Sequence, residues 1–128
     1  SGVITVRKMV AAFDCGQAVN PDSVAAQIEG ATIMGLSTAL KEKITFAKGG
    51  VATSNFSDYE ILTMSEVPAI EVHIVTNNDE MGGVGEPGLP PVIPAVANAV
   101  LAAAGIRLRS LPMTPDGVRK ALAKAAGK

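Results

Sequence analysis

Tryptophan is absent from this sequence of 128 residues, and aromatic residues make up only 3% of it. A folded core must therefore be built from small aliphatic side chains, which the hydrophobic content of 48% can supply. The five methionines are expected to fill gaps in that core; they are Met9, Met34, Met64, Met81 and Met113. The sequence also lacks any apolar run long enough to be read as a membrane-spanning helix.

Cysteine and histidine occur only once each, as Cys15 and His73. A single cysteine excludes an internal disulfide and a metal cluster held by several thiolates. One cysteine and one histidine are also too few to form a zinc site of several cysteine and histidine ligands from this chain alone. His73 alternates with apolar residues in the run Ile70–Val75, which is typical of a strand. We therefore expect His73 to face solvent and not to serve a catalytic triad.

An excess of basic residues is also missing, because 11 lysines and arginines face 12 acids and give a formal net charge of −1. This balance argues against a nucleic-acid-binding protein, which would carry a basic stripe. The length suits one domain that buries about two-thirds of its unfolded surface. The sequence opens at Ser1 inside a strand-like pattern. We expect residues 1–128 to form a single domain that is a fragment of a longer chain.

Hydrophobic periodicity and turn residues predict an α+β domain. Strands are expected over residues 3–14, 44–47, 51–55, 68–75 and 106–109, and a polar turn over residues 77–80. Helices are expected from Asp22 to about Lys43, from Val92 to Ala104, and from Pro115 to about Ala126. Asn20 or Asp22 can cap the first helix, Gly105 ends the second, and Thr114 caps the third. The predicted architecture is a small mixed sheet packed against two main helices plus a C-terminal helix.

Small residues line one face of the first predicted helix. Gly30, Ala31 and Gly35 leave almost no side chain there, so another group must come very close to the helix. A neighbouring helix is one candidate for that group, and a large ligand is the other. Gln27 on this helix offers amide donors and an acceptor for the polar rim of a heterocycle, or is a solvated position. Glu29 follows two residues later and points to a different face.

The stretch Gly82–Pro91 places a lone carboxylate, Glu86, between three preceding glycines and three following prolines. Glycine allows close backbone approach, and proline fixes φ and restricts the residue before it. The pattern predicts a stiff, tightly bent loop just ahead of a helix. This loop is either an ordinary surface connection with an incidental acid or a rigid mount for a general base that is shielded from water.

Several motifs follow one another in a fixed order: Asp14–Gly16, Val19–Pro21, Gln27–Ala31, Gly35–Leu36 and Val84–Pro87. Together they resemble the C-terminal part of the molybdopterin-binding large subunit in the xanthine dehydrogenase/aldehyde oxidase family of molybdenum hydroxylases. The stretches 54–59 and 71–75 look most like the large (beta) subunit of the isoquinoline 1-oxidoreductase branch. The likeness covers nearly the whole chain, and its order and spacing make it specific.

The resemblance implies a chemical role for three residues. Glu86 would be the general base beside molybdenum, Gln27 would contact the pterin, and Gly85 would let the loop approach the cofactor. In bacterial members that cofactor is typically molybdopterin cytosine dinucleotide, whose dithiolene holds the metal, so the resemblance implies no metal ligand from a protein side chain. The implied activity is hydroxylation of an N-heterocycle or aldehyde carbon with water as the oxygen source.

The resemblance also implies partners. These are the remainder of the molybdopterin-binding subunit and an iron–sulfur small subunit that carries [2Fe–2S] clusters. The isolated chain is therefore expected to bind cofactor poorly and to be inactive. The alternative is a stand-alone interaction or small-molecule-binding domain that keeps the fold without catalysis. The substrate stays open, and so does the compartment, bacterial cytoplasm or periplasm.

Overall fold

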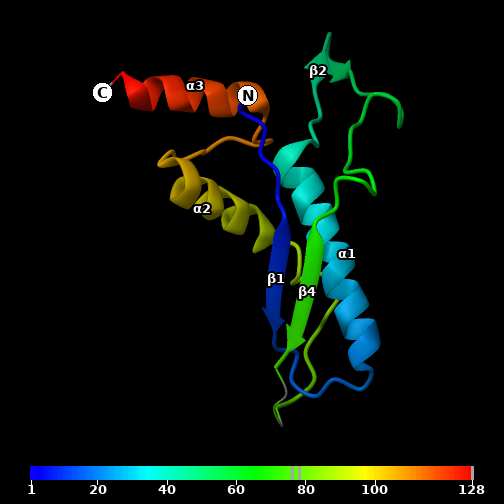
Figure 1. The fold of residues 1–128 in the computed structure, drawn as a ribbon. Coiled ribbons are helices and arrows are strands. Elements are labelled where there is room, and N and C mark those ends of the chain that lie inside the picture. The colour runs from blue at the N-terminus through cyan, green and yellow to red at the C-terminus, as the bar shows by residue number, and fades with distance from the viewer. Residues whose placement is uncertain (76, 78, 128) are drawn as a thin grey trace.

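The computed structural model describes residues 1–75, 77 and 79–127, which run through four short strands and three helices (Figure 1). The strands are β1 (Lys8–Phe13), β2 (Phe46–Ala47), β3 (Gly50–Val51) and β4 (Ala69–Ile74). The helices are α1 (Pro21–Leu40), α2 (Val92–Ala104) and α3 (Pro115–Ala126). The predicted α+β class is confirmed. The polar turn predicted over residues 77–80 includes Asn78, which lies outside the described residues.

The helix ends follow from local chemistry. The side chain of Asn20 accepts a hydrogen bond from Ser23 N at 3.0 Å and caps α1, and Thr114 Oγ1 accepts one from Gly117 N at 3.2 Å and caps α3. Gly105 ends α2 in the left-handed region, with φ of 67°. Each cap satisfies a backbone group that the helix itself leaves unpaired. All three were predicted, although α1 ends at Leu40 and not near Lys43.

The strands form two separate two-stranded sheets among the described residues, where the sequence predicted one small mixed sheet. β1 and β4 pair in parallel, with Met9 opposite Ile70, and β2 and β3 form an antiparallel hairpin, with Phe46 opposite Val51. The parallel pair lies against α1, and the hairpin stands apart near the C-terminal end of that helix (Figure 1).

Four of the five predicted strands are shorter in the structure, and the fifth is missing from the described residues. β1 begins at Lys8, because its partner β4 begins at Ala69 and the residue before it, Pro68, has no N–H to donate to a ladder. Residues 106–109 alternate as predicted, with Ile106 buried and Arg107 exposed, yet they form no strand in the described part of the chain. Alternation sets which side chains are buried, but a strand also needs a partner at the right place.

The core is built from small aliphatic residues, as the composition predicted. Leu36 and Ala39 of α1 pack against Val92 and Val96 of α2 and against Met113. A second cluster joins α2 to α3 through Val100, Ile106 and Val118. The prediction for methionine is wrong at three positions that are exposed: Met34, Met64 and Met81. Within the described residues, no helix has the length and apolarity needed to cross a membrane.

The small residues of α1 mark a close contact with the segment that leads into α2. A Cβ atom on Gly35 would lie 2.8 Å from Val92 Cβ and 3.1 Å from Leu89 O, and one on Gly88 would lie 2.9 Å from Ala31 Cβ. The close neighbour of this stripe is therefore the end of the Gly82–Pro91 loop and the first turn of α2. Gly30 takes no part, because a Cβ there would meet no atom within 4 Å.

This difference between two glycines of one helix gives a matched test of the packing. Gly35→Ala should lower the free energy of unfolding by about 1–3 kcal/mol, because the new methyl group overlaps Val92. Gly30→Ala should raise it by about 0.5–1 kcal/mol, because only the helix propensity changes. Urea denaturation followed by circular dichroism measures both effects. Equal effects of the two substitutions would show that the close approach at Gly35 does not limit the packing.

Candidate functional site

The site begins at the carboxyl ends of the two parallel strands, where the chain leaves β1 and β4 side by side. The Asp14 carboxylate accepts hydrogen bonds from Gly16 N at 2.9 Å and from Asn77 Nδ2 at 2.9 Å. Cys15 is buried, and its carbonyl oxygen accepts a hydrogen bond from Gly82 N at 2.8 Å. The segment after β1 therefore holds the start of the Gly82–Pro91 loop in place.

Gly16 makes this junction possible. Its φ is +68°, and a Cβ atom there would lie 2.1 Å from Glu80 O, so no larger residue fits without movement of the backbone. Next to it, Gln17 N donates to Asp79 O at 3.3 Å. The sequence pattern Asp14–Gly16 is typical of a turn closed by an aspartate side chain, but nothing in the sequence identified the segment that this turn would hold.

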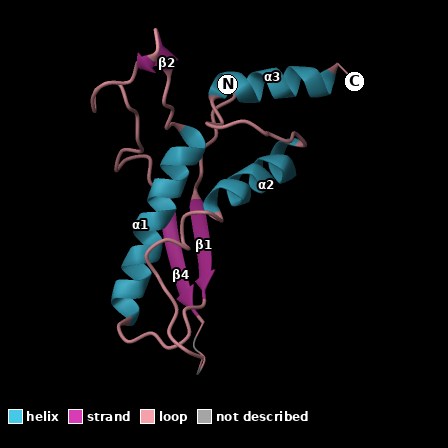
Figure 2. Cartoon of the chain, turned by 180° about the vertical axis from the view of Figure 1, so that it is seen from behind, coloured by secondary structure: helices cyan, strands magenta, loops and turns pink. Residues whose placement is uncertain are grey.

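From this junction the loop runs along α1 in the same direction as the helix, from the end near Cys15 to the start of α2 (Figure 2). Gly88 is buried against Ala31, and Leu89 O comes close to Gly35. Leu89 N donates to Glu86 O at 3.2 Å and Val92 N to Leu89 O at 3.2 Å, so two tight turns follow Glu86. The predicted bend just ahead of a helix is confirmed.

The three candidate residues lie near the contact between the loop and α1, and this part of the molecule is here called the candidate surface. Glu86 and Gly85 precede Gly88 by only two and three residues, and Gln27 lies one helical turn before Ala31. Residues four apart on a helix share a face, so the contact between Gly88 and Ala31 sets Gln27 beside the loop. Glu86 and Gln27 are therefore both within a few residues of the point where the loop packs on α1.

All three candidate residues are open to solvent in this chain. Gln27, Gly85 and Glu86 are exposed, and a Cβ atom on Gly85 or on Gly83 would meet no atom within 4 Å. The shielding from water that a general base would need is therefore not supplied by residues 1–75, 77 and 79–127. The roles of these residues stay predictions.

Other residues considered from the sequence lie outside this surface. Glu29 is exposed on α1, two positions from Gln27. His73 faces solvent on β4 as predicted, with its Nε2 at 2.6 Å from Glu71 Oε1. Lys8 on β1 pairs with the same carboxylate, and Lys8 and then His73 hold the pKa of Glu71 below its usual value. In the described part of the chain, no cluster of three or more His, Cys, Asp or Glu side chains could hold a metal ion.

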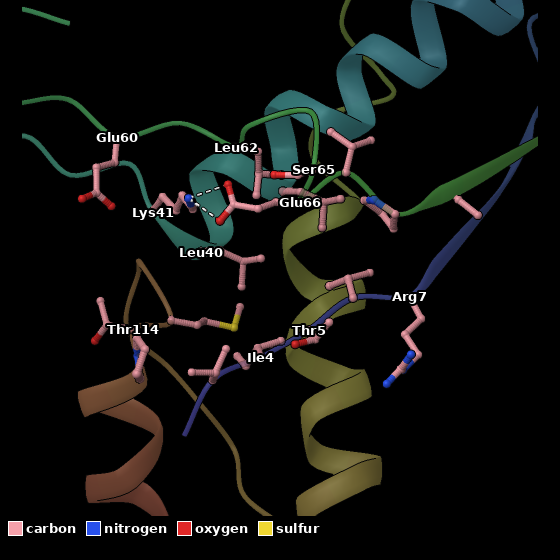
Figure 3. Close-up of a pocket in the computed structure, with 18 residues that line it drawn as sticks. Ile4, Thr5, Arg7, Leu40, Lys41, Glu60, Leu62, Ser65, Glu66 and Thr114 are labelled. Carbon is pink, nitrogen blue, oxygen red and sulfur yellow. Dashed lines mark hydrogen bonds and ion pairs between the residues drawn. The ribbon is translucent and has the colours of Figure 1, made fainter. Parts of the chain in front are cut away.

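A cavity of about 710 Å³ lies elsewhere, between the N-terminal segment, the C-terminal end of α1 and the segment before β4 (Figure 3). Its apolar lining includes Ile4, Leu36, Leu40, Leu62, Val67 and Met113. None of the three candidate residues lines it. This cavity is therefore separate from the candidate surface.

One ion pair closes a side of this cavity. Lys41 Nζ lies 2.6 Å from Glu66 Oε1 (Figure 3). Thr63 donates to Glu66 Oε2 from its backbone N and its Oγ1, each at 2.8 Å. The hydrogen bond from Lys41 and then those from Thr63 lower the pKa of Glu66 to about 2. The carboxylate is therefore ionised at neutral pH and fixes the segment before β4 to the end of α1.

Comparison with known proteins assigns the chain to a family. A family model described as the molybdopterin cofactor-binding domain matches residues 1–68. The chain belongs to this family. Gln27 lies inside the matched region, whereas Gly85 and Glu86 follow it in the sequence. The predicted relationship to the large subunits of xanthine dehydrogenase and aldehyde oxidase enzymes is confirmed.

Individual relatives extend the match beyond residue 68. The beta subunit of isoquinoline 1-oxidoreductase from Brevundimonas diminuta is 46% identical over 88% of this chain and 14% of its own length. A nicotinate dehydrogenase subunit of Pseudomonas putida is 41% identical over 95% of this chain and 10% of its own length. The solved structure of quinoline 2-oxidoreductase from Pseudomonas putida 86 superposes with a TM-score of 0.81 at 25% identity, covering 92% of this chain and 16% of that one. The chain thus spans a sixth or less of these proteins.

The ion pair at the cavity predicts a dependence of stability on pH. In the fold the pKa of Glu66 is lowered from 4.5 to about 2, so the unfolded state binds its proton more readily than the folded state does. Glu66 therefore stabilises the fold above about pH 4.5, and this stabilisation is lost as the pH falls from 4.5 towards 2. Glu66→Gln should flatten the fall of Tm over this interval in thermal melts.

The matched control is Glu60→Gln, which removes a carboxylate from the lining of the same cavity. That variant should keep the pH dependence of the unaltered chain. An unchanged pH dependence of Tm in Glu66→Gln would mean that the Lys41 pair does not couple protonation to folding.

Proposed function

We propose that this chain is the part of a molybdenum hydroxylase large subunit that presents a carboxylate and an amide to the molybdopterin cofactor. The observation that supports the proposal is the contact of Gly88 with Ala31, because Glu86 lies two residues before Gly88 and Gln27 lies one helical turn before Ala31. The reaction is hydroxylation of an electron-poor carbon with water as the oxygen source. The three relatives described above are named for isoquinoline, nicotinate and quinoline, which supports a nitrogen heterocycle as substrate, while relatives that are 35% identical are named for aldehydes.

The residues on this surface fit a large planar cofactor. Open space above Gly83 and Gly85 lets such a group approach the backbone of the loop without meeting a side chain. The amide of Gln27 has two donors and an acceptor with which to bind the polar edge of the pterin. When bound, molybdopterin cytosine dinucleotide supplies the redox chemistry and the metal. The chain itself supplies position, hydrogen bonds and a site for one proton.

Glu86 is the proton acceptor in this proposal. Its backbone is held from both sides, by the junction of Cys15 with Gly82 and by the burial of Gly88, so the base of its side chain has a limited range of positions. Such positioning is what a general base requires, because proton transfer needs hydrogen-bond distance to the attacking oxygen. Because Glu86 is exposed here, the dry environment comes from parts of the subunit that cover this surface.

The complete assembly in this proposal contains the remainder of the molybdopterin-binding subunit and an iron–sulfur small subunit with [2Fe–2S] clusters. The chain spans 10–16% of the three relatives, so most of the residues that surround the cofactor and the substrate belong to sequence outside it. On its own the chain supplies one edge of the site. We therefore propose that the isolated chain is inactive.

The role of Glu86 is tested by Glu86→Gln in the complete enzyme. The amide keeps the size of the side chain but cannot accept the proton, so turnover should fall by about 10²–10⁴-fold while the molybdenum content is unchanged. Steady-state kinetics and metal analysis of the same sample measure the two quantities. Glu80→Gln, which removes an exposed carboxylate shortly before the same loop, is the control and should keep full turnover. Loss of molybdenum together with activity would assign Glu86 a structural role.

The role of Gln27 is tested by cofactor retention. Gln27→Ala in the complete enzyme should lower the molybdenum content after dialysis, because the pterin loses hydrogen bonds that hold its edge. Gln17→Ala is the matched control, since Gln17 is exposed and contributes to the fold through its backbone N–H to Asp79. Equal molybdenum contents in the two variants would exclude a cofactor contact for Gln27.

A further inference from the structure

Residues 44–61, here called the arm, project from the C-terminal end of α1 and include the β2–β3 hairpin (Figure 1). A hairpin with two residues in each strand is marginally stable by itself. The arm nevertheless exposes large apolar side chains, each between 50% and 96% open to solvent: Ile44, Phe46, Val51, Phe56 and Ile61. It carries two of the three phenylalanines of a chain that is poor in aromatic residues.

An ordered turn in the arm, on the segment that follows the hairpin, presents Phe56. The Asp58 carboxylate accepts hydrogen bonds from Ser54 N at 3.0 Å, Ser54 Oγ at 3.0 Å and Asn55 N at 2.8 Å. These bonds, first that of Asn55 and then those of Ser54, lower the pKa of Asp58. Asn55 Oδ1 in turn accepts from Phe56 N at 2.8 Å. The backbone of Phe56 is thus fixed while its side chain is 96% exposed.

The base of the arm is fixed to α1 as well. Tyr59 donates its hydroxyl to Glu42 Oε2 at 3.1 Å, and Thr38 Oγ1 donates to the same oxygen at 2.9 Å. Leu62 N, just beyond the arm, donates to Ser37 Oγ at 3.1 Å. A segment whose backbone is already held by such hydrogen bonds loses little conformational entropy on binding. Exposed aromatic side chains on a backbone that is already in its bound conformation are typical of the anchor residues of an interface.

We infer that the arm is a docking element whose Phe56 inserts into an apolar pocket on the remaining part of the same molybdopterin-binding subunit. The inference rests on the proposed function, in which the chain is one part of that subunit. The length of the relatives identifies what binds the arm. Of each of the three relatives, 84% or more lies outside the region that this chain covers. That length is ample to cover an apolar arm, which would otherwise be an aggregation hazard in water.

The arm lies away from the candidate surface. It leaves α1 after Leu40, and Gln27 lies 13 positions earlier, roughly 20 Å along the helix axis. None of the exposed apolar residues of the arm belongs to the candidate surface around Glu86. Docking of the arm is therefore measurable without any dependence on the redox chemistry.

The test is photo-crosslinking in the complete subunit with Phe56→p-benzoylphenylalanine, which keeps an apolar aromatic side chain in this turn. Illumination should give an intramolecular cross-link to a peptide outside residues 1–128, at least tenfold more abundant than in the urea-unfolded subunit. Absence of a cross-link overturns the inference. A cross-link to a second copy or to a different subunit overturns it as well, because each identifies another occupant.

A second measurement uses the unaltered subunit and so does not depend on the folding of a variant. Chymotrypsin cleaves after phenylalanine, and Phe13 in β1 is the internal control for an intact fold. Cleavage after Phe56 should be slowed at least tenfold relative to the unfolded subunit, in parallel with Phe13. Protection of Phe13 with rapid cleavage after Phe56 overturns the inference. Molybdenum analysis separates the two proposals, since a cross-linked arm in a subunit that never takes up molybdenum refutes only the proposed function.

Discussion

The close packing of the Gly82–Pro91 loop against α1 is the constraint on which the candidate surface depends. Gly88 comes so near to Ala31, and Gly35 so near to Val92, that side chains on either glycine would force the two segments apart. Val92 in turn lies in the core. The loop is thus held at both ends, by the core and by the Cys15 carbonyl. The position of Glu86 therefore follows from contacts that its neighbours make and not from contacts of its own.

Features that depend on nearby residues could be predicted from the sequence, and features that depend on distant partners could not. The caps Asn20 and Thr114 and the stop at Gly105 satisfy backbone groups within one turn, so their chemistry is visible in a short window. Residues 106–109 have the alternation of a strand but no partner among the described residues. The small stripe on α1 predicted a close neighbour, yet whether that neighbour was protein or ligand required the tertiary contact.

The candidate surface shows the same division. The chemistry of Glu86 and Gln27 can be read from residue type, but their proximity comes from the contact between Gly88 and Ala31, which lie far apart in the sequence. The sequence left open whether Glu86 is exposed or shielded from water, and in this chain it is exposed, whereas the exposure of Met34 and Met81 contradicts their expected place in the core. The hydrophobic pattern identifies side chains that suit burial, and the stiffness of a loop identifies a carboxylate that could serve as a base once it is shielded from water. They do not say whether the same segment or another part of a larger protein provides that shielding.

The arm and the candidate surface sit towards opposite ends of one helix, and this arrangement has a mechanical consequence. α1 is continuous over 20 residues, about 30 Å, and the segment that carries the arm is bound by Ser37 in its last turn and by Glu42 just beyond its end. A partner that fixes the arm therefore also fixes the direction of the helix. Gln27 and the loop packed on Ala31 move with that helix as one body. Because an error of about 1 Å in the position of a reacting group can cost 10²-fold in rate, contacts far from the chemistry can govern its efficiency.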